Sequence, residues 1–480
     1  MASEIRVNKI ENRSGLGTVT FADTGVDLAG IVTATTFSGS GANLTSLPAA
    51  QLSGTLPALD GSALTGVAST ENIRTNTNAT FLQNVNVSGS TTTGTTIVGG
   101  GVTISESGIE ASGIGITCAS FNGGQISGRR NIIINGDMRI AQRGTSTTSQ
   151  AYLIDRFKME YSGVDESPTY AQADVASGTT PHTLGFRKSL KITNGNQTGG
   201  AGVTDYIQIW NRLEAQNVAN SGWNYYSASS FITLSFWIKS SVAQAFSGSL
   251  RTFDGTTYSY KFDTPSLSAD TWTKVIKTVP GNSNLTISND NGAGMQFLLY
   301  SFIGTDYTTS NSDTETWVVG GNNYANDMTS TWYSTNDATL EITGLQLEVG
   351  SQATPFEHRS LGEELSLCHR YYYRQTIEAN RTYATSAMSD NDDQNIYAFF
   401  PFPTEMRTAP TAVEQNGTAG HYRVRRDTTK SCSGVPTFSD ATRWSARVNF
   451  PSSGHGWGTG QFLWAQSGSS SSYIGFSAEL

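Results

Sequence analysis

The first 130 residues of this chain contain no tryptophan and no tyrosine, whereas all 9 Trp and all 19 Tyr lie in residues 131–480. Large aromatic side chains supply much of the apolar area that a globular core buries. The first segment holds only four phenylalanines, which is too little for a globular core of its length. Its six basic and eight acidic residues are also too few for a solvated disordered tail. The sequence therefore predicts two structurally different parts.

Short apolar runs recur in the first part where a core is lacking. Leucines recur every few residues from Leu44 to Leu64, and β-branched runs such as Val102-Thr-Ile104 follow. Each run is too small to bury its own apolar side, so a neighbouring chain must cover it. We expect residues 1–40 to form an attachment segment and residues 41–130 a slender repetitive shaft of three parallel chains. The alternative is a flexible Gly/Ser/Thr linker, which leaves the regular Leu and Val positions unexplained.

Residues 131–359 show the alternation that is typical of half-buried strands. In the segment 231–239, Ile232, Leu234, Phe236 and Ile238 fall on one face, and Thr233, Ser235, Trp237 and Lys239 on the other. Turn clusters separate such segments, and no convincing helix lies among them. Further strands are expected at Tyr206–Trp210, Trp272–Val279, Met295–Ile303 and Leu340–Val349. The pattern predicts a mainly β fold with a β-sandwich of jelly-roll type.

One helix is predicted after the sandwich. Ser360-Leu-Gly-Glu363 is a capping box. Leu361, Leu365, Cys368 and Tyr372 follow at helical spacing. We expect a short helical connector over residues 360–376, which leads to a β-rich C-terminal tip at 377–480. Two roles stay open for this helix: an ordinary connector, or a collar of three helices around a trimer axis.

Charge and cysteine content exclude several classes of protein. The net charge of −9 and the pI near 5.1 argue against nucleic acid or an anionic membrane surface as the main partner. The start has no apolar signal region, and no run approaches eighteen apolar residues, so we expect no membrane insertion. Cys118, Cys368 and Cys432 are too widely spaced to suggest a disulfide framework or a zinc site.

Motifs of enzymes are absent from the sequence. There is no G-x-S-x-G elbow, no H-E-x-x-H and no P-loop, and the five histidines share no metal-ligand spacing. We therefore expect no catalytic residue, no metal and no cofactor. A pair of carboxylates could still cut a glycosidic bond, but sequence does not reveal the separation that such a pair needs.

Candidate glycan-binding residues follow from composition, because sugar sites pair exposed aromatic rings with polar side chains. Three segments have this composition, and their candidates are Trp223, Tyr225 and Tyr226; Trp332 and Tyr333; and His455, Trp457 and Gln461. For each ring, the alternative is burial in the core or against another subunit. Arg423, Arg425 and Arg426 form a basic stretch that could contact anionic groups, although such charges more often lie on a solvated face or in salt bridges.

Several motifs resemble those of tail-fibre and other virion proteins of cyanobacterial and marine bacteriophages. The opening ASEIRVNKIENRSGLGTVTF and the later GIVTATTFSGSGANLTSLPA resemble their N-terminal and shaft segments. Asn131-Ile-Ile-Ile-Asn-Gly-Asp137 and Ile342-Thr-Gly-Leu-Gln-Leu-Glu-Val-Gly350 are similar to the two ends of a tail-fibre domain with a carbohydrate-binding-module-like jelly roll. The resemblance implies a homotrimer with its virion end at the N-terminus and its receptor end at the C-terminus. It does not extend in any specific way to residues 377–480.

Residues and resemblance together predict a receptor-binding fibre of the virion tail, assembled in the host cytoplasm. Its N-terminus would bind a baseplate or tail protein, and its head would bind a host-surface polysaccharide such as lipopolysaccharide. Two alternatives stay open: a purely structural fibre or baseplate component without a ligand, and a spike that depolymerises a glycan.

Overall fold

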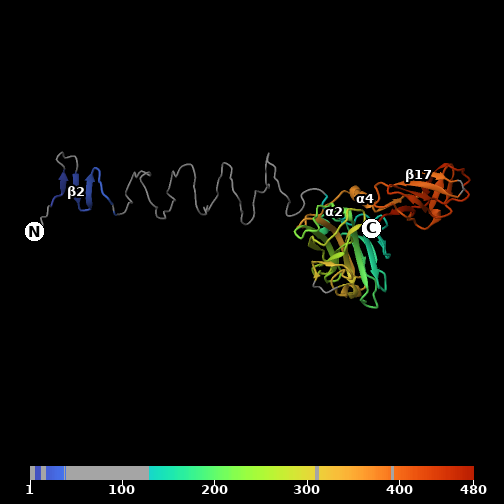
Figure 1. Ribbon diagram of the computed structural model, residues 1–480, viewed down its shortest axis with the longest axis horizontal. Coiled ribbons are helices and arrows are strands. Elements are labelled where there is room, and N and C mark those ends of the chain that lie inside the picture. The colour runs from blue at the N-terminus through green and yellow to red at the C-terminus, as the bar shows by residue number, and fades with distance from the viewer. Residues whose placement is uncertain (1–5, 12–17, 37, 39–128, 309–312, 391–393) are drawn as a thin grey trace. The chain divides into compact units, whose positions relative to one another are not determined.

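The computed structural model describes residues 6–11, 18–36, 38, 129–308, 313–390 and 394–480 of the chain. These residues belong to two units, with residues 6–38 in the first and residues 129–480 in the second (Figure 1). The described fold is mainly β, as the sequence predicted. The predicted shaft at 41–130 lies outside the described residues, except for Arg129 and Arg130.

The first unit contains a three-stranded antiparallel sheet, with strands β1 (Lys9–Glu11), β2 (Thr18–Ala22) and β3 (Gly25–Ala29). The register pairs Ile10 with Val19, Val19 with Leu28, and Phe21 with Val26. Residues directly opposite one another share a face of a sheet, so these five apolar side chains lie on one face.

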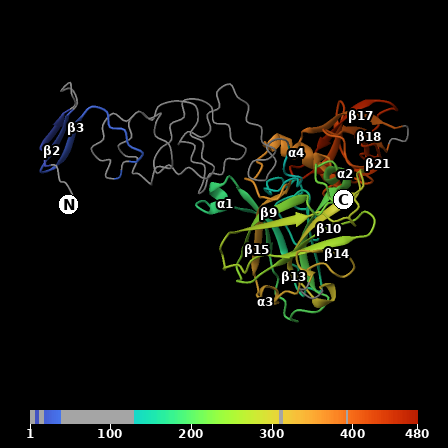
Figure 2. The ribbon, with the colours of Figure 1, turned by 60° about the vertical axis from the view of Figure 1, so that its left-hand side comes forward.

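Two six-stranded antiparallel sheets form the sandwich of the second unit (Figure 2). The first sheet runs in the order β14 (Trp317–Val319), β11 (Tyr258–Asp263), β10 (Ser247–Thr252), β13 (Ala293–Ile303), β8 (Tyr206–Glu214), β5 (Phe157–Ser162). The second sheet runs in the order β12 (Thr273–Pro280), β9 (Phe231–Ser240), β15 (Thr339–Val349), β7 (Lys188–Thr193), β6 (Thr169–Asp174), β4 (Ser146–Thr147). The side chains that both sheets turn inward form the main hydrophobic core.

The strands that alternation predicted in the sandwich are confirmed. In β9, Ile232, Leu234, Phe236 and Ile238 all lie in the core, as the sequence predicted. The other face of β9 is partly covered by the chain that follows β15, where the hydroxyl of Thr233 donates to the carbonyl oxygen of Gly350 at 2.8 Å.

The two motifs that bracket the sandwich lie against each other. The side chain of Asn131 accepts from the backbone N–H of Leu347 at 3.1 Å and donates to the carbonyl oxygen of Leu345 at 3.1 Å. A Cβ atom on Gly136 would lie 2.0 Å from that same carbonyl oxygen. Glycine is therefore required at this position, because only its backbone comes close enough to β15.

Helix α4 (Leu361–His369) begins at the predicted capping box, where the hydroxyl of Ser360 accepts from the backbone N–H of Glu363 at 3.2 Å. The prediction that the helix reaches residue 376 is wrong. Strand β16 (Tyr372–Thr376) follows instead and pairs with β24 (Tyr473–Ser477). Three consecutive tyrosines favour a strand here, and long-range pairing with β24 outweighs the local helical spacing. The collar role of the helix stays a prediction.

The C-terminal region contains a seven-stranded antiparallel sheet, as the β-rich prediction for this part requires. Its order is β20 (Thr429–Ser431), β19 (Tyr422–Arg425), β23 (Phe462–Ser467), β17 (Thr382–Ser389), β18 (Ile396–Pro401), β22 (Ser445–Asn449), β21 (Thr437–Ala441). A second hydrophobic core covers one face of this sheet.

Short helical segments complete the described elements: α1 (Thr180–Thr183), α2 (Ala215–Ala219), α3 (Thr331–Ser334), and the 3-10 turns η3 (Thr305–Tyr307) and η5 (Ala419–His421). Within the described residues, no helix is long and apolar enough to cross a membrane. The same residues contain no group of three His, Cys, Asp or Glu side chains that could hold a metal ion. Cys368 and Cys432 are buried free thiols, and Cys118 lies outside the described residues.

Candidate functional site

Trp332 and Tyr333 lie in α3 and belong to the core of the sandwich. Trp332 is 0% exposed and donates from its indole nitrogen to the carbonyl oxygen of Thr339 at 3.1 Å. Tyr333 is 1% exposed and donates to the carboxylate of Asp205 at 3.1 Å. The sequence named both rings as glycan-binding candidates and left burial in the core as the alternative. The structure shows burial, because both rings have their apolar and polar contacts inside the protein.

The loop that holds Trp223, Tyr225 and Tyr226 exposes only its last ring. Trp223 is buried, and its indole nitrogen donates to the carbonyl oxygen of Ser230 at 3.3 Å. Tyr225 is partly buried and donates to the carbonyl oxygen of Ile287 at 3.2 Å. Tyr226 is 58% exposed and packs edge-on against Tyr225. A single exposed ring remains at this position, and Trp223 follows the alternative of burial in the core.

His455 and Trp457 are buried as well, which corrects the expectation of an exposed tip loop. Their rings stack with centroids 5.4 Å apart, and the indole nitrogen of Trp457 donates to the carboxylate of Asp427 at 3.2 Å. Gly454 and Gly456 adopt positive φ angles of 66° and 70°. These glycines turn the loop back toward the core, whereas the sequence suggested that they leave the rings uncovered. Gln461 is half-buried.

The three arginines of the predicted basic stretch differ in their exposure to solvent. Arg423 donates to the side-chain oxygen of Asn380 at 2.6 Å. Arg425 and Arg426 are exposed. Two of the three arginines are thus accessible to an anionic group.

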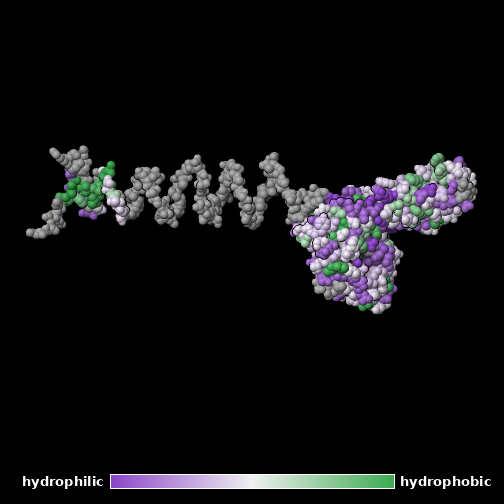
Figure 3. All heavy atoms as spheres, in the orientation of Figure 1, coloured by the Kyte–Doolittle hydropathy of each residue, from purple (hydrophilic) through white to green (hydrophobic). Residues whose placement is uncertain are grey.

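A different set of apolar side chains reaches the surface of the C-terminal region (Figure 3). They are Met388, Phe399, Trp444, Phe462 and Trp464. The sequence contains a signal for them, because β23 reads Phe-Leu-Trp-Ala and is apolar in both phases of its alternation. Alternation cannot tell which of two apolar phases faces the core.

The sandwich carries a pocket on the outer face of its first sheet. In β8, Ile207 and Ile209 enter the core, so Tyr206, Gln208 and Trp210 point outward. In β13, Tyr300 points outward and lies opposite Gln208 in the register. The alternation of β8 therefore places an amide between aromatic rings on this face.

Two further tyrosines reach this face from loops. Gly304 ends β13 in a tight turn, in which its backbone N–H donates to the carbonyl oxygen of Asp205 at 2.7 Å. The turn leads into η3 and brings Tyr307 edge-on to Tyr206, with ring centroids 5.7 Å apart. The backbone N–H of Tyr324 donates to the carbonyl oxygen of Tyr307 at 3.1 Å, which adds the fourth ring.

A partly open pocket of about 170 Å³, named here the tyrosine pocket, is lined by Tyr206, Gln208, Tyr300, Ile303, Tyr307 and Tyr324. Among the described residues, no hydroxyl of the four tyrosines forms a hydrogen bond within the protein. Whole-ligand sites commonly measure roughly 300–1,000 Å³. The tyrosine pocket is smaller, so it fits one ring of a larger ligand.

The polar rim of the pocket is held in place by neighbouring side chains. The amide of Gln208 donates to the carboxylate of Glu160 at 3.1 Å, and the Lys158 ammonium lies 2.5 Å from the same carboxylate. On the other side, the Arg251 guanidinium carbon lies 4.2 Å from the centroid of the Tyr324 ring. Nη1 of Arg251 is buried and has no hydrogen-bond partner among the described residues.

Protonation states favour a neutral, hydroxyl-rich ligand. Burial raises the pKa of Tyr300 and of Tyr206, so both keep a hydroxyl proton to donate near neutral pH. Burial alone would raise the pKa of Glu160, but its hydrogen bonds, above all that from Lys158, hold the pKa below the usual value. The pocket thus offers neutral hydroxyl donors, an ionised acceptor and flat rings.

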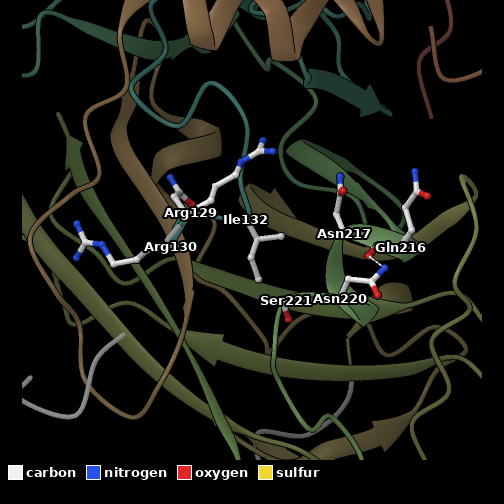
Figure 4. A pocket seen from close by; sticks show the side chains of 8 residues that line it. Arg129, Arg130, Ile132, Gln216, Asn217, Asn220 and Ser221 are labelled. Carbon is white, nitrogen blue, oxygen red and sulfur yellow. Dashed lines mark hydrogen bonds between the residues drawn. The ribbon is translucent and has the colours of Figure 1, made fainter. Parts of the chain in front are cut away.

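A larger hollow of about 450 Å³ lies where the chain enters the sandwich. Arg129, Arg130 and Ile132 form one side, and residues of α2 with Asn220 and Ser221 form the other (Figure 4). Its lining is polar and basic and contains no aromatic ring. The tyrosine pocket is the better candidate for a sugar, because it combines rings with polar groups.

Comparisons with known proteins give only distant likenesses. No family model matches the chain, and no curated protein sequence matches it. Among solved structures, the enzymatically active domain of bacteriophage CBA120 tailspike protein 4 is similar at 13% identity and a TM-score of 0.25, with 46% of this chain and 21% of the tailspike chain covered.

Two carbohydrate-binding structures are similarly distant. The N-terminal cellulose-binding domain of Cellulomonas fimi β-1,4-glucanase C is 11% identical with a TM-score of 0.22, covering 44% of this chain and 97% of that domain. A family 11 carbohydrate-binding module of a Clostridium thermocellum cellulase is 14% identical with a TM-score of 0.21, covering 46% of this chain and 96% of that module. At these values the likenesses assign no ligand, activity or partner to this chain.

Proposed function

We propose that this chain is a receptor-binding tail fibre of a bacteriophage and that its tyrosine pocket holds one ring of a host-surface glycan. The observation that carries the glycan part is the pocket itself: four tyrosine hydroxyls without a hydrogen-bond partner among the described residues, beside the amide of Gln208. A sugar ring places C–H groups against aromatic faces and hydroxyls against such polar atoms.

The fibre part of the proposal comes from the sequence. Motifs at the N-terminus and at both ends of the sandwich resemble those of phage tail fibres. In this proposal the chain is a homotrimer, its N-terminus binds a baseplate or tail protein, and its host is cyanobacterial or marine. Three weak pockets on one head then gain avidity through effective concentration, without any single tight contact.

Substitution of pocket tyrosines tests the proposal. We expect Tyr206→Ala and Tyr307→Ala to weaken binding of purified full-length protein to intact host cells by roughly tenfold each, since stacked rings contribute about 1–2 kcal/mol. Flow cytometry of labelled protein measures the binding. Tyr226→Ala is the matched control, because its ring is exposed on another loop. Unchanged binding of both pocket variants would rule out the tyrosine pocket as the receptor site.

The same experiment distinguishes the two alternatives when released reducing sugar is measured in parallel. Binding without release supports a receptor-binding fibre. Absence of both supports a structural fibre or baseplate component. Release of sugar supports a depolymerising spike, which would need a pair of carboxylates at a suitable separation.

A further inference from the structure

The seven-stranded sheet turns an aromatic face away from its core. In the register, Met388 lies opposite both Phe462 and Tyr397, so these three side chains cross β23, β17 and β18 in one row. The neighbours of Met388 and Tyr397 on the opposite face, Ala387 and Ala398, are buried in the core. The outward residues Tyr397, Phe399, Arg425, Phe462 and Trp464 are named the C-terminal aromatic face.

The rings of this face are open to solvent. Phe462 is 78% exposed, Phe399 is 49% exposed and Trp464 is 43% exposed. Contiguous exposed apolar side chains of this kind mark a binding surface. Neighbouring strands lie about 4.7–4.9 Å apart across a sheet, so side chains in one row of this face form a flat platform, whereas the tyrosine pocket is a hollow between rings.

The face also carries one arginine, Arg425, that has no counterion among the described residues. Arg425 lies across from Trp464, with its guanidinium carbon 5.6 Å from the ring centroid. Among the described residues, Arg425 forms no ion pair, whereas Arg426 interacts electrostatically with the adjacent carboxylate of Asp427. Asp440 lies on β21, which four other strands of the sheet separate from β19, and pairs with Arg447 at 2.7 Å. The positive charge of Arg425 is therefore available to a ligand.

We propose that the C-terminal aromatic face binds an acidic polysaccharide. Its sugar rings would lie on Trp464, Phe462 and Tyr397, and its anionic groups would meet Arg425. Charge-assisted hydrogen bonds from arginine to carboxylate, sulfate or phosphate are among the strong polar contacts in proteins. The class of ligand rests on the proposed role in glycan binding, but the surface and the residues are separate from the tyrosine pocket.

Charge favours a glycan over a second copy of the chain. A second copy packed on this face by a two-fold axis would present the same unpaired Arg425 and the same Asp440, already paired with Arg447. Arg425 would then lose water without gaining a counterion, which is unfavourable. An acidic polysaccharide supplies the anions that Arg425 lacks and the apolar C–H faces that can pack on the exposed rings.

The test uses the full-length protein with three polymers: polygalacturonate, dextran sulfate and neutral dextran. We expect an acidic polymer to bind and neutral dextran not to bind, with affinity that falls as salt rises. Arg425→Ala and Trp464→Ala should each weaken binding of the acidic polymer about tenfold, as measured by biolayer interferometry. Arg425→Lys should retain only part of the affinity, because lysine keeps the charge without the planar guanidinium.

Matched controls stand on the same region of the chain. Arg381→Ala removes an arginine whose side chain is 69% exposed, and Trp444→Ala removes an indole that is 58% exposed in the turn between β21 and β22. Both should bind the acidic polymer like the unchanged protein. All of these positions are exposed, so circular dichroism should show the same fold in every variant.

Each outcome either supports the proposal or overturns it. Loss of binding in both Arg425→Ala and Trp464→Ala supports the proposal, and the polymer that binds more tightly identifies the anion. Equal loss in Arg381→Ala overturns it and indicates simple charge attraction. A change of molecular mass in sedimentation velocity for Phe462→Ser overturns it and makes the face a subunit contact. Tyr206→Ala distinguishes the two proposals. If this variant binds host cells like the unchanged protein, the result contradicts the proposal for the tyrosine pocket and leaves the proposal for the C-terminal aromatic face unaffected.

Discussion

The buried carboxyl group of Asp155 makes the stability of this protein depend on pH. Its side chain is 1% exposed and accepts hydrogen bonds from the backbone N–H and the side-chain amide of Gln142. Gln142 also donates to the carbonyl oxygen of Tyr372, so this carboxyl group lies beside the link between the sandwich and the C-terminal region. Burial raises the pKa of Asp155 to about 6. The protonated form is therefore favoured by the folded state.

The raised pKa fixes the sign of a pH effect on stability. The folded state binds this proton more tightly than the unfolded state, so the contribution is complete below the unfolded pKa and is lost as pH rises through about 6. We expect Asp155→Asn to become more stable relative to the unchanged protein, by up to about 3 kcal/mol, between acidic and neutral pH. Urea unfolding at both pH values measures this difference. Asp174→Asn, on a side chain that is 83% exposed, should show no such change.

At the scale of elements, the turn after β13 positions half of the tyrosine pocket. A Cβ atom on Gly304 would lie 2.3 Å from the carbonyl oxygen of Val203 and 2.6 Å from that of Gly202. Real Cβ atoms do not come this close to backbone oxygens, so any other residue must displace the turn. The turn leads directly into η3, which carries Tyr307, so the conformation of the turn sets the position of this pocket ring.

We expect Gly304→Ala to lower the free energy of unfolding by about 1–3 kcal/mol and to weaken glycan binding together with it, because Tyr307 moves away from Tyr206. Thermal unfolding and cell binding measure the two effects. Gly458→Ala is the control, since a Cβ atom there meets no atom within 4 Å. A variant with normal stability and normal binding would show that the turn does not position the pocket.

At the scale of the whole molecule, buried arginines join the sandwich to the C-terminal region. Arg156 is 2% exposed, pairs with Glu479, and has its guanidinium carbon 3.4 Å from the centroid of the Tyr371 ring. Arg143 lies over the ring of Tyr372 at 3.3 Å and pairs with the same carboxylate, also at 3.3 Å. One carboxylate near residue 480 thus neutralises two arginines of the sandwich.

Removal of this charge should uncouple the two parts. We expect Glu479→Gln to lower the free energy of unfolding by about 3–5 kcal/mol, because Arg156 stays buried without a counterion. Calorimetry should then show two separate transitions in residues 129–480 where the unchanged protein shows one. Glu378→Gln, on a side chain that is 84% exposed, should unfold like the unchanged protein. A single unshifted transition in Glu479→Gln would contradict the coupling.

The sequence by itself determined the local structure of this protein. The alternation of Ile232 to Ile238 assigned one face of β9 to the core, and the pair Ser360 and Glu363 marked the start of α4. Both features depend on neighbours within a few residues, so the pattern of the chain is sufficient to predict them. The same locality explains the mainly β fold and the paucity of helices.

Only the tertiary structure decided which rings face solvent. Composition left open whether Trp332 and Trp457 face solvent or the core. Long-range packing buries both, whereas Phe462 and Trp464 are exposed in a strand that is apolar on both faces. The tyrosine pocket likewise needs Tyr206 and Tyr300 from two strands and Tyr307 and Tyr324 from loops. Composition and alternation describe what a segment contains. Whether another segment covers it depends on packing between residues that are far apart in the sequence.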